Sequence, residues 1–335
     1  MNPFYLLLGT GLLIASIVDL LWTALWVDGG AGPLSSRLSA GTWSGLKTVG
    51  SDHPRVLSLA GPLILTLSIV MWIGLIWAGW TFVFAAGGER ALIPMNAPNS
   101  PLTWPGRGYY VAYTMFTDGN GDFAPNGAPW QIASALTTAS GMLFVTIAVS
   151  YILSVLGAVS DKRSFASSVT GLGSRGEAFV RTGWDGEDLN QLDLPLNSLA
   201  SDVNRLAEQH KSYPILHYYH SERDADASKM AVAIFDDALT LIRFGVPEEH
   251  KPNTALVEDA RSSTFDYLQT LDNAFIDPAD QLPPAPDLDR LRDAGIPTVS
   301  DEEFDDAMED LDERRRRLLA MIEADARYWP PVEDE

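Results

Sequence analysis

The chain has 335 residues, of which 46% are hydrophobic, and its formal net charge is −21 at pH 7. The sequence divides accordingly, because residues 1–160 carry 5 basic and 6 acidic side chains, whereas residues 161–335 carry 18 and 38. This balance argues against nucleic acid as a partner, since no basic patch exists to contact phosphates. Cysteine is absent, which excludes disulfides and thiolate metal sites.

An apolar run over residues 4–27 is long enough to cross a bilayer as a helix. No basic stretch precedes it, so we expect a retained membrane helix and not a cleaved signal peptide. Trp22 and Trp26 are expected at a membrane interface. Asp19 lies inside the run, and such a carboxylate is either a functional group or a locally paired group that packs helices together.

Two further apolar runs, residues 57–86 and 130–157, are also long enough to span a bilayer. Residues 33–49 are weakly amphipathic and predict either a helix on the membrane surface or an ordinary loop. Basic residues cluster at 37–55 and at 162–181. The positive-inside rule therefore predicts a multi-pass protein of the cell membrane whose N-terminus is outside and whose acidic half is cytoplasmic.

Beyond residue 163 the apolar periodicity is helical and predicts an all-α domain. Helices are expected at about 196–206, 226–244, 256–271 and 301–328. The last of these has an apolar stripe that could form a coiled-coil seam between subunits or dock on its own domain. Residues 314–317 are four arginines in a row, which we interpret as a solvated, salt-bridged face.

The stretch 109–125 lies between the second and third predicted spans and contains an irregular, glycine-bearing segment. Irregular backbone at membrane depth is tolerated only where protein buries it or where it lines water. Glycine permits backbone angles that aim successive carbonyl oxygens at a common axis. Four copies of such a segment around that axis can replace the hydration shell of a monovalent cation.

The residues concerned read Thr117-Asp118-Gly119-Asn120-Gly121-Asp122, with Thr114 before them and Pro125 after them. This pattern resembles the pore helix and selectivity filter of the prokaryotic potassium-channel superfamily, whose usual filter is Thr-Val-Gly-Tyr-Gly-Asp. The resemblance implies a re-entrant pore helix over residues 107–116. It also implies that the cation-binding filter consists of Thr117, Asp118, Gly119, Asn120, Gly121 and Asp122.

The resemblance further implies passive conduction of potassium through a homotetramer in a lipid bilayer. Potassium ions would occupy the filter, and no other cofactor and no enzymatic activity are expected. Asp118 and Asn120 depart from the usual filter, which leaves a weakly selective sodium/potassium pore as an alternative. A membrane-anchored signalling or interaction protein with a non-conducting, pore-like loop is a second alternative.

The third span would then be the helix that lines the pore. Gly141 lies where the family has its gating hinge, and glycine weakens a helix locally. Thr137 and Thr138 are expected to line the wet cavity, and Phe144 is expected to contribute to a dewetting gate. The alternative for all four residues is ordinary helix packing, which small residues commonly mediate in membranes.

Three histidines, His210, His217 and His220, fall in one short stretch. They are weak candidates for a metal site or a pH sensor, although partly buried members of an aromatic cluster fit the sequence better, and we predict no metal. Residues 171–176 match the glycine pattern of dinucleotide-binding proteins. Because no strand precedes them, we interpret this segment as a linker and expect no nucleotide cofactor.

The sequence therefore predicts an all-α membrane protein with three transmembrane helices, a re-entrant pore helix with its filter loop, and an all-α cytoplasmic domain. The predicted regions are 1–56 (first span and linker), 57–163 (pore domain) and 164–335 (acidic helical domain). A carboxylate-rich, lysine-poor surface favours adaptation to a salt-rich, halophilic cytoplasm over an ordinary acidic domain.

Overall fold

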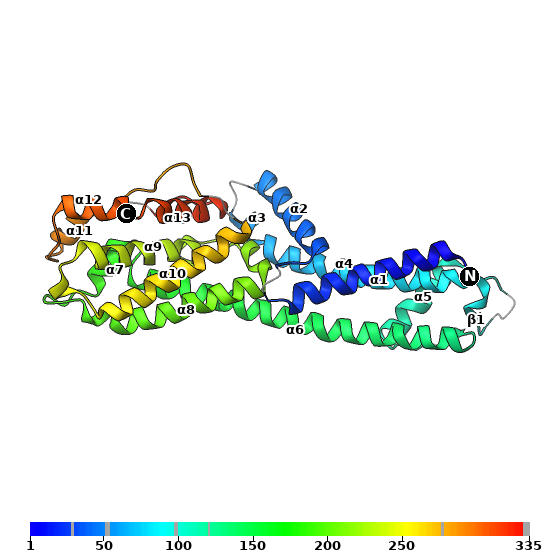
Figure 1. The fold of residues 1–335 in the computed structure, drawn as a ribbon. Coiled ribbons are helices and arrows are strands. Elements are labelled where there is room, and N and C mark those ends of the chain that lie inside the picture. Colours follow the sequence, from blue (N-terminus) through cyan, green and yellow to red (C-terminus); the bar gives the residue numbers. More distant parts are fainter. Residues whose placement is uncertain (28–29, 51–53, 97–99, 120, 276–277, 331–335) are drawn as a thin grey trace. The chain divides into compact units, whose positions relative to one another are not determined.

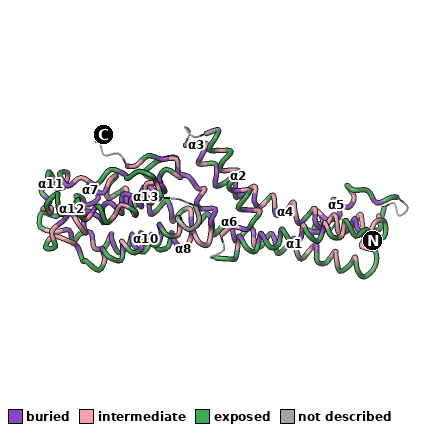
Figure 2. The backbone as a smooth tube through the Cα atoms, turned by 45° about the horizontal axis from the view of Figure 1, so that its top comes forward, coloured by how far each residue is buried: buried purple, intermediate pink, exposed green. Residues whose placement is uncertain are grey.

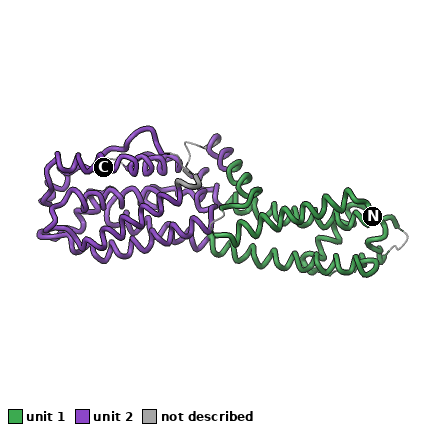
Figure 3. Tube along the Cα trace, in the orientation of Figure 1, with its two compact units in different colours: residues 1–42, 62–155 green, residues 43–61, 156–335 purple. Residues whose placement is uncertain are grey.

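The computed structural model describes residues 1–335 apart from 28–29, 51–53, 97–99, 120, 276–277 and 331–335 (Figure 1). The described chain is predominantly helical. It divides into two compact units, of which the first comprises residues 1–42 with 62–155 and the second residues 43–61 with 156–335 (Figure 3). The three regions expected from the sequence have other boundaries and stay a prediction.

The first part of the chain forms long helices joined by short irregular segments. Its elements are α1 (Pro3–Leu25), α2 (Pro33–Gly50), α3 (Pro54–Ser58), α4 (Ala60–Ala86), η1 (Gly88–Arg90), β1 (Leu92–Pro94), α5 (Trp104–Met115), β2 (Phe123–Pro125) and α6 (Ala128–Leu172). Three described segments are helical, long and apolar enough to cross a membrane: Pro3–Leu25, Arg55–Ala86 and Ala128–Leu172. This confirms a mainly helical membrane protein with three candidate spans.

Close packing of small residues joins α1 to α4. A Cβ atom added at Gly9 would lie 2.6 Å from the carbonyl oxygen of Gly79, so the two backbones approach where side chains are missing. Glycine contacts of this kind are typical of helix pairs in membranes. Much of the remaining surface of α1 is exposed, as expected for a helix that faces lipid (Figure 2). Residues 33–50, predicted as either a surface helix or a loop, form a helix.

The second unit is a helical domain built around α9. Its elements after α6 are α7 (Gly176–Thr182), η2 (Asn190–Leu192), α8 (Asp193–Ser212), η3 (Pro214–Tyr218), η4 (Asp224–Asp226), α9 (Ser228–Thr240), η5 (Leu241–Gly245), η6 (Glu248–His250), α10 (Thr254–Phe275), α11 (Leu288–Asp293), α12 (Asp301–Glu309) and α13 (Asp312–Ala324). All 13 residues of α9 are buried. α9 packs against α7, α10 and α13, and α8 lies along α10 (Figure 1).

The C-terminal helices correct two expectations. The helix predicted over 301–328 is divided into α12 and α13. Its apolar side docks on its own domain, since Phe304 and Leu318 are buried in the core of the second unit. The solvated face predicted at residues 314–317 is wrong for Arg314 and Arg315, because both side chains form ion pairs with buried aspartates of α9.

Candidate functional site

The short helix α5 begins at a side-chain cap. The Thr103 hydroxyl accepts a hydrogen bond from the amide of Gly106 at 3.2 Å, and Pro105 occupies the first turn, where a missing amide proton costs nothing. The helix ends at Met115, after which the chain enters the predicted filter loop and then β2. The cap and the proline therefore define where α5 starts.

Polar bonds hold α5 between α4 and α6. On one side, the indole nitrogen of Trp77 in α4 donates to the carbonyl oxygen of Gly108 at 2.8 Å. On the other side, the Tyr110 hydroxyl donates to Oγ of Ser134 in α6 at 2.6 Å. Because donors and acceptors sit on three separate helices, the position of α5 is fixed by side chains that lie far apart in the sequence.

The predicted filter loop has a left-handed backbone at alternate positions. The φ angle is +61° at Thr117, +60° at Gly119 and +80° at Gly121. Glycine adopts these angles readily, but a β-branched threonine does so only under strain, which is typical of functional segments. Five of the six predicted filter positions are described, and Asn120 lies outside the described residues. The Asp118 side chain is exposed in the single chain.

The end of α5 holds the beginning of the loop. The Thr117 amide donates to the carbonyl oxygen of Thr114 at 3.2 Å, and the Asp118 amide donates to that of Tyr113 at 2.8 Å. Strained backbone persists only where the surrounding structure over-determines it. These two bonds supply such a restraint on Thr117.

Asp122 anchors the other end of the loop. Its carboxylate accepts hydrogen bonds from the Tyr109 hydroxyl at 3.1 Å and from the Asn96 side-chain amide at 2.9 Å, while its carbonyl oxygen accepts from the Met95 amide at 2.8 Å. Charge-assisted bonds of this kind are stronger than neutral ones. Asp122 therefore joins the loop to α5 and to the segment that follows β1.

The second strand of a two-stranded antiparallel sheet begins directly after Asp122. β1 pairs antiparallel with β2, and Pro94 lies opposite Phe123. The Tyr113 hydroxyl also donates to the carbonyl oxygen of Phe123 at 3.1 Å. Tyr109 and Tyr113 are one turn apart on α5, with ring centroids at 5.1 Å, so one face of this helix holds both Asp122 and Phe123.

Gly141 of α6 lies against the end of α5. A Cβ atom there would be only 2.0 Å from the carbonyl oxygen of Met115, so only glycine permits this contact. α6 is continuous through Gly141, and the hinge stays a prediction. Thr138 donates from its hydroxyl to the carbonyl oxygen of Thr114 at 3.2 Å, whereas Thr137 is fully buried and bonds to the carbonyl oxygen of Ala133.

The two faces of α6 differ in burial. Phe144, expected in a dewetting gate, is buried within its own chain, as is Tyr151, whose ring lies 6.1 Å from that of Trp72 in α4. Apolar residues on another face are exposed at helical spacing. These are Met142, Val145, Val149 and Leu153. In the single chain this second face is exposed, and the gate role expected for Phe144 stays a prediction.

Comparison with known proteins agrees with this geometry. Residues 70–158, which contain most of α4, all of α5 and most of α6 up to residue 158, match the family model described as "Ion channel". Over 333 residues, the chain is 43% identical to the "Uncharacterized membrane protein YdjJ" of Bacillus subtilis (strain 168), which covers 99% of this chain and 97% of that protein. The chain belongs to the YdjJ family. No solved structure matched it.

Asp19 of this YdjJ-family chain is a fully satisfied structural group. It is buried, and its carboxylate accepts hydrogen bonds from Trp72 Nε1 at 2.8 Å, from the Leu34 amide at 2.7 Å, and from the Ser35 amide and hydroxyl at 3.2 and 2.5 Å. A negative charge at a helix N-terminus is stabilising, and here it caps α2. Of the two sequence alternatives for Asp19, this geometry fits helix packing.

The three histidines lie in the helical domain of the YdjJ-family chain, and all are buried. Among the described residues no group of three or more potential metal-ligating side chains is placed to hold an ion. Burial lowers the pKa of His210 to about 3 and the pKa of His217 well below its usual value, and nearby lysines act in the same direction. These two histidines therefore stay neutral at physiological pH, which argues against a pH sensor there.

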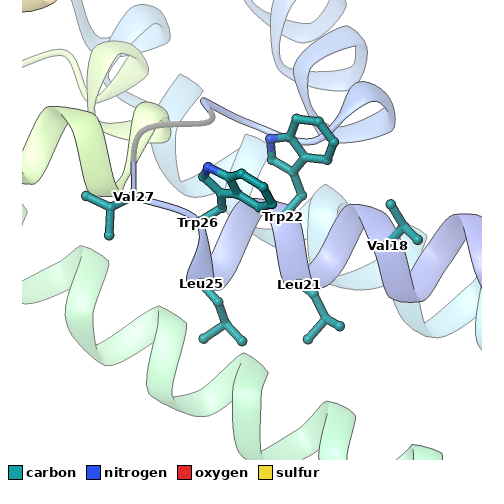
Figure 4. Close-up of a pocket in the computed structure, with 6 residues that line it drawn as sticks. All are labelled: Val18, Leu21, Trp22, Leu25, Trp26 and Val27. Atoms are coloured by element: carbon teal, nitrogen blue, oxygen red, sulfur yellow. The ribbon is translucent and has the colours of Figure 1, made fainter.

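An apolar pocket of about 580 Å³ lies on the last turns of α1 (Figure 4). The rings of Trp22 and Trp26 stack beside it with centroids at 5.5 Å. Its lining consists of Val18, Leu21, Trp22, Leu25, Trp26 and Val27. Because this lining is apolar and lies at the end of a candidate membrane span, the pocket fits hydrocarbon contact and offers no group for chemistry.

Two side-chain arrangements in the YdjJ-family chain were missed by sequence reasoning. The first is the bonding of Tyr109 and Asn96 to Asp122, for which the tyrosine pair at i and i+4 on α5 was the available signal. The second is the pairing of adjacent aspartates at 236–237 with adjacent arginines at 314–315. Two complementary charge doublets were visible in the sequence, but nothing there indicated that they meet.

Proposed function

We propose that four copies of this chain assemble around their 117–122 loops and conduct monovalent cations passively across the cell membrane, with potassium preferred. One observation carries the proposal. The left-handed angles at Thr117, Gly119 and Gly121 follow directly on a helix that is wedged between two spans of an ion-channel domain. Such a backbone suits a ladder of inward-directed carbonyl oxygens.

The ion-binding groups of this pore are main-chain atoms. Carbonyl oxygens of Thr117, Asp118, Gly119 and Asn120 from four copies replace the water around each potassium ion, and the Thr117 hydroxyl closes the inner end. The C-terminal end of α5 carries partial negative charge because its last carbonyls have no helical partner, which favours a cation beside it. The pore therefore needs no further cofactor.

A weakly selective sodium/potassium pore is the second candidate. It is favoured by the exposed Asp118 side chain, which stands where an apolar residue is usual in the resembling filters. A carboxylate beside the loop attracts sodium as well as potassium and packs less tightly than a valine. The preference for potassium over sodium depends on how firmly the loop is held, whereas conduction of either ion does not.

The inner part of the pore is assigned to the exposed stripe of α6. Met142, Val145, Val149 and Leu153 present an apolar surface in the single chain, and four copies facing one axis would form a constriction that closes by dewetting. Phe144 packs within its own chain and supports this stripe from behind. Gly141 permits local bending of α6.

The orientation follows from charge. Basic residues flank the inner ends of the spans, so the N-terminus and the 117–122 loop lie outside and the acidic helical domain lies in the cytoplasm. The acidic domain raises the local cation concentration at the inner mouth, an effect that high salt screens.

Purified protein in liposomes tests the proposal directly. We expect tetramers in detergent and potassium flux that exceeds sodium flux. Equal flux of the two ions would favour the weakly selective pore. Protein that is folded, monomeric or dimeric, and without flux for either ion would contradict the channel proposal.

A further inference from the structure

The helical domain contains a buried helix whose charges are matched from the C-terminus. α9 is buried along its whole length, yet it carries Lys229, Asp236 and Asp237. Buried charges are costly unless they are paired. Their partners lie in residues 301–330, which we call the C-terminal strap.

The pairing follows a fixed order of signs along α9. Near its start, Lys229 Nζ lies 3.1 Å from Oδ1 of Asp325. Two turns later, Arg314 donates from Nε to Asp236 at 2.9 Å, and Arg315 donates to Asp237 at 2.6 Å. Along α9 the order is therefore one cation, Lys229, and then two anions. The strap supplies the opposite charges in the matching order, first Asp325 and then its two arginines.

This order of charges specifies one register. Sliding the strap along α9 would bring like charges together or leave charges buried and unpaired, both of which are unfavourable. Conversely, desolvation offsets much of the attraction within buried ion pairs, so the docked strap gains less stability than its bonds suggest. The strap therefore docks in a single register, but its docking is weak enough for the strap to be released.

The end of the strap reaches a segment that contacts two pore-domain helices. Asp325 Oδ2 lies 3.4 Å from Nδ1 of His220, and Arg327 donates to the carbonyl oxygen of Ser221. In the same segment, the carbonyl oxygen of Tyr219 accepts a 2.7 Å hydrogen bond from Nζ of Lys162, which lies on α6.

The same segment also contacts the start of α4. A Cβ atom at Gly61 would lie 2.5 Å from the ring of Tyr219, so this ring sits directly on the backbone of α4. Residues 213–221 therefore form a junction. His220 and Ser221 of the junction contact the strap. Tyr219 contacts Lys162 of α6 and Gly61 of α4. The predicted filter lies between these two helices in the sequence.

We propose that the C-terminal strap is an inhibitory device: docked on α9, it holds the 213–221 junction and thereby fixes the cytoplasmic ends of α4 and α6, and its release frees these helices and raises ion flux. The inhibitory effect on flux rests on the proposed function, whereas the mechanical link from strap to junction does not. Opening requires relative movement of packed helices, which a junction bonded to both opposes.

A single introduced thiol reports whether the strap is docked. The chain has no cysteine, and Ala320 of the strap is 6% exposed, so Ala320→Cys provides one buried thiol whose modification by a maleimide measures release. In this background, Asp325→Asn removes the charge that Lys229 and Arg327 share, with little change in shape. The matched control is Glu313→Gln, which removes an exposed ion pair with Arg317 on the same helix.

Asp325→Asn should increase thiol modification, hydrogen exchange in residues 213–221 and potassium flux, the last by about fivefold or more, while Glu313→Gln changes none of them. If Asp325→Asn alone unfolds the domain, the neutral pair Lys229→Met with Asp325→Asn serves instead, because it leaves no unpaired lysine.

A released strap with unchanged exchange at 213–221 would overturn the mechanical link. Increased exchange with unchanged or reduced flux would overturn inhibition. A wild type without flux would refute the proposed function and, with it, inhibition, while the exchange data would still decide the link.

Discussion

The hydroxyl of Tyr109 and the carboxylate of Asp122 are joined by a hydrogen bond of 3.1 Å. This bond spans thirteen residues of sequence and ties the C-terminal end of the 117–122 loop to α5. The loop is thus held at both ends by the same helix, since the Asp118 amide bonds to the carbonyl oxygen of Tyr113.

Tyr109→Phe should loosen the C-terminal end of the 117–122 loop, the proposed filter. The variant keeps the ring but loses the hydrogen bond to the Asp122 carboxylate, so this end of the loop can shift toward other conformations. We expect reduced selectivity for potassium over sodium and a faster decline of flux in liposomes. Tyr110→Phe is the comparison on the same helix, because that hydroxyl bonds to Ser134 of α6 and acts on the loop only through the position of α5. Equal effects of the two variants would contradict a specific role for Tyr109.

Gly119→Ala should abolish flux and leave the protein assembled. The φ angle of +60° disfavours alanine by about 1–2 kcal/mol, while nothing in the chain blocks the added methyl group. The backbone of the loop therefore changes without damage to packing. Gly11→Ala is a control on the exposed side of α1, where a Cβ meets no atom within 4 Å. Retained flux in Gly119→Ala would show that residues 117–122 are not the filter.

Gly141→Ala separates packing from bending. The added Cβ would overlap the carbonyl oxygen of Met115, so α5 and α6 must move apart at a cost of about 1–3 kcal/mol. We expect a lower thermal stability of the protein in detergent. Gly157→Ala on the same helix meets no atom within 4 Å and should not lower it. A Gly141→Ala variant with wild-type stability but altered opening would instead support the hinge.

The helical domain should lose stability in mild acid. The pKa of His210 is lowered by burial to about 3, below its ordinary value of 6.5, so between these values the unfolded chain binds a proton that the folded chain does not. Stability is therefore complete above pH 6.5 and falls toward pH 3, by about 1.4 kcal/mol per pH unit for this histidine.

Thermal unfolding measured from pH 7 to pH 5 checks this dependence. His210→Asn keeps a side-chain amide able to donate to the carbonyl oxygen of Leu206, the bond partner of His210. It should show a smaller decrease with falling pH than the wild type. The slopes are compared, because the substitution itself lowers stability at every pH. An unchanged slope would mean that His210 does not stay neutral in the fold.

Much of the membrane part could be predicted because apolar length and turn residues report local structure. The three candidate spans follow from runs of apolar residues. The helix expected over 107–116 begins three residues earlier, at Trp104, because the Thr103 cap and Pro105 start it there. The third span was predicted to end at residue 157, yet α6 continues to Leu172, since no proline interrupts it where the composition becomes polar. A change of polarity marks the end of a membrane span but not the end of a helix.

Partners that lie far apart in sequence could not be predicted. Arg315 reads as one of four exposed arginines, but it is buried against Asp237, 78 residues away. Phe144 and Val145 are neighbours that face different sides of α6, and only the packing of the folded chain decides which is buried. In both cases the sequence specifies the chemistry of a side chain, whereas its surroundings depend on which helices pack together.

The four hydrogen bonds to Asp19 have a consequence for biosynthesis. A carboxylate within an inserting helix costs up to about 2.5–3.5 kcal/mol, and the donors that offset this cost come from Leu34, Ser35 and Trp72, all of which are translated later. The first span therefore reaches its full stability in the bilayer only after α2 and α4 have followed. A nascent chain that stops at residue 27 should remain less firmly inserted than its apolar composition indicates.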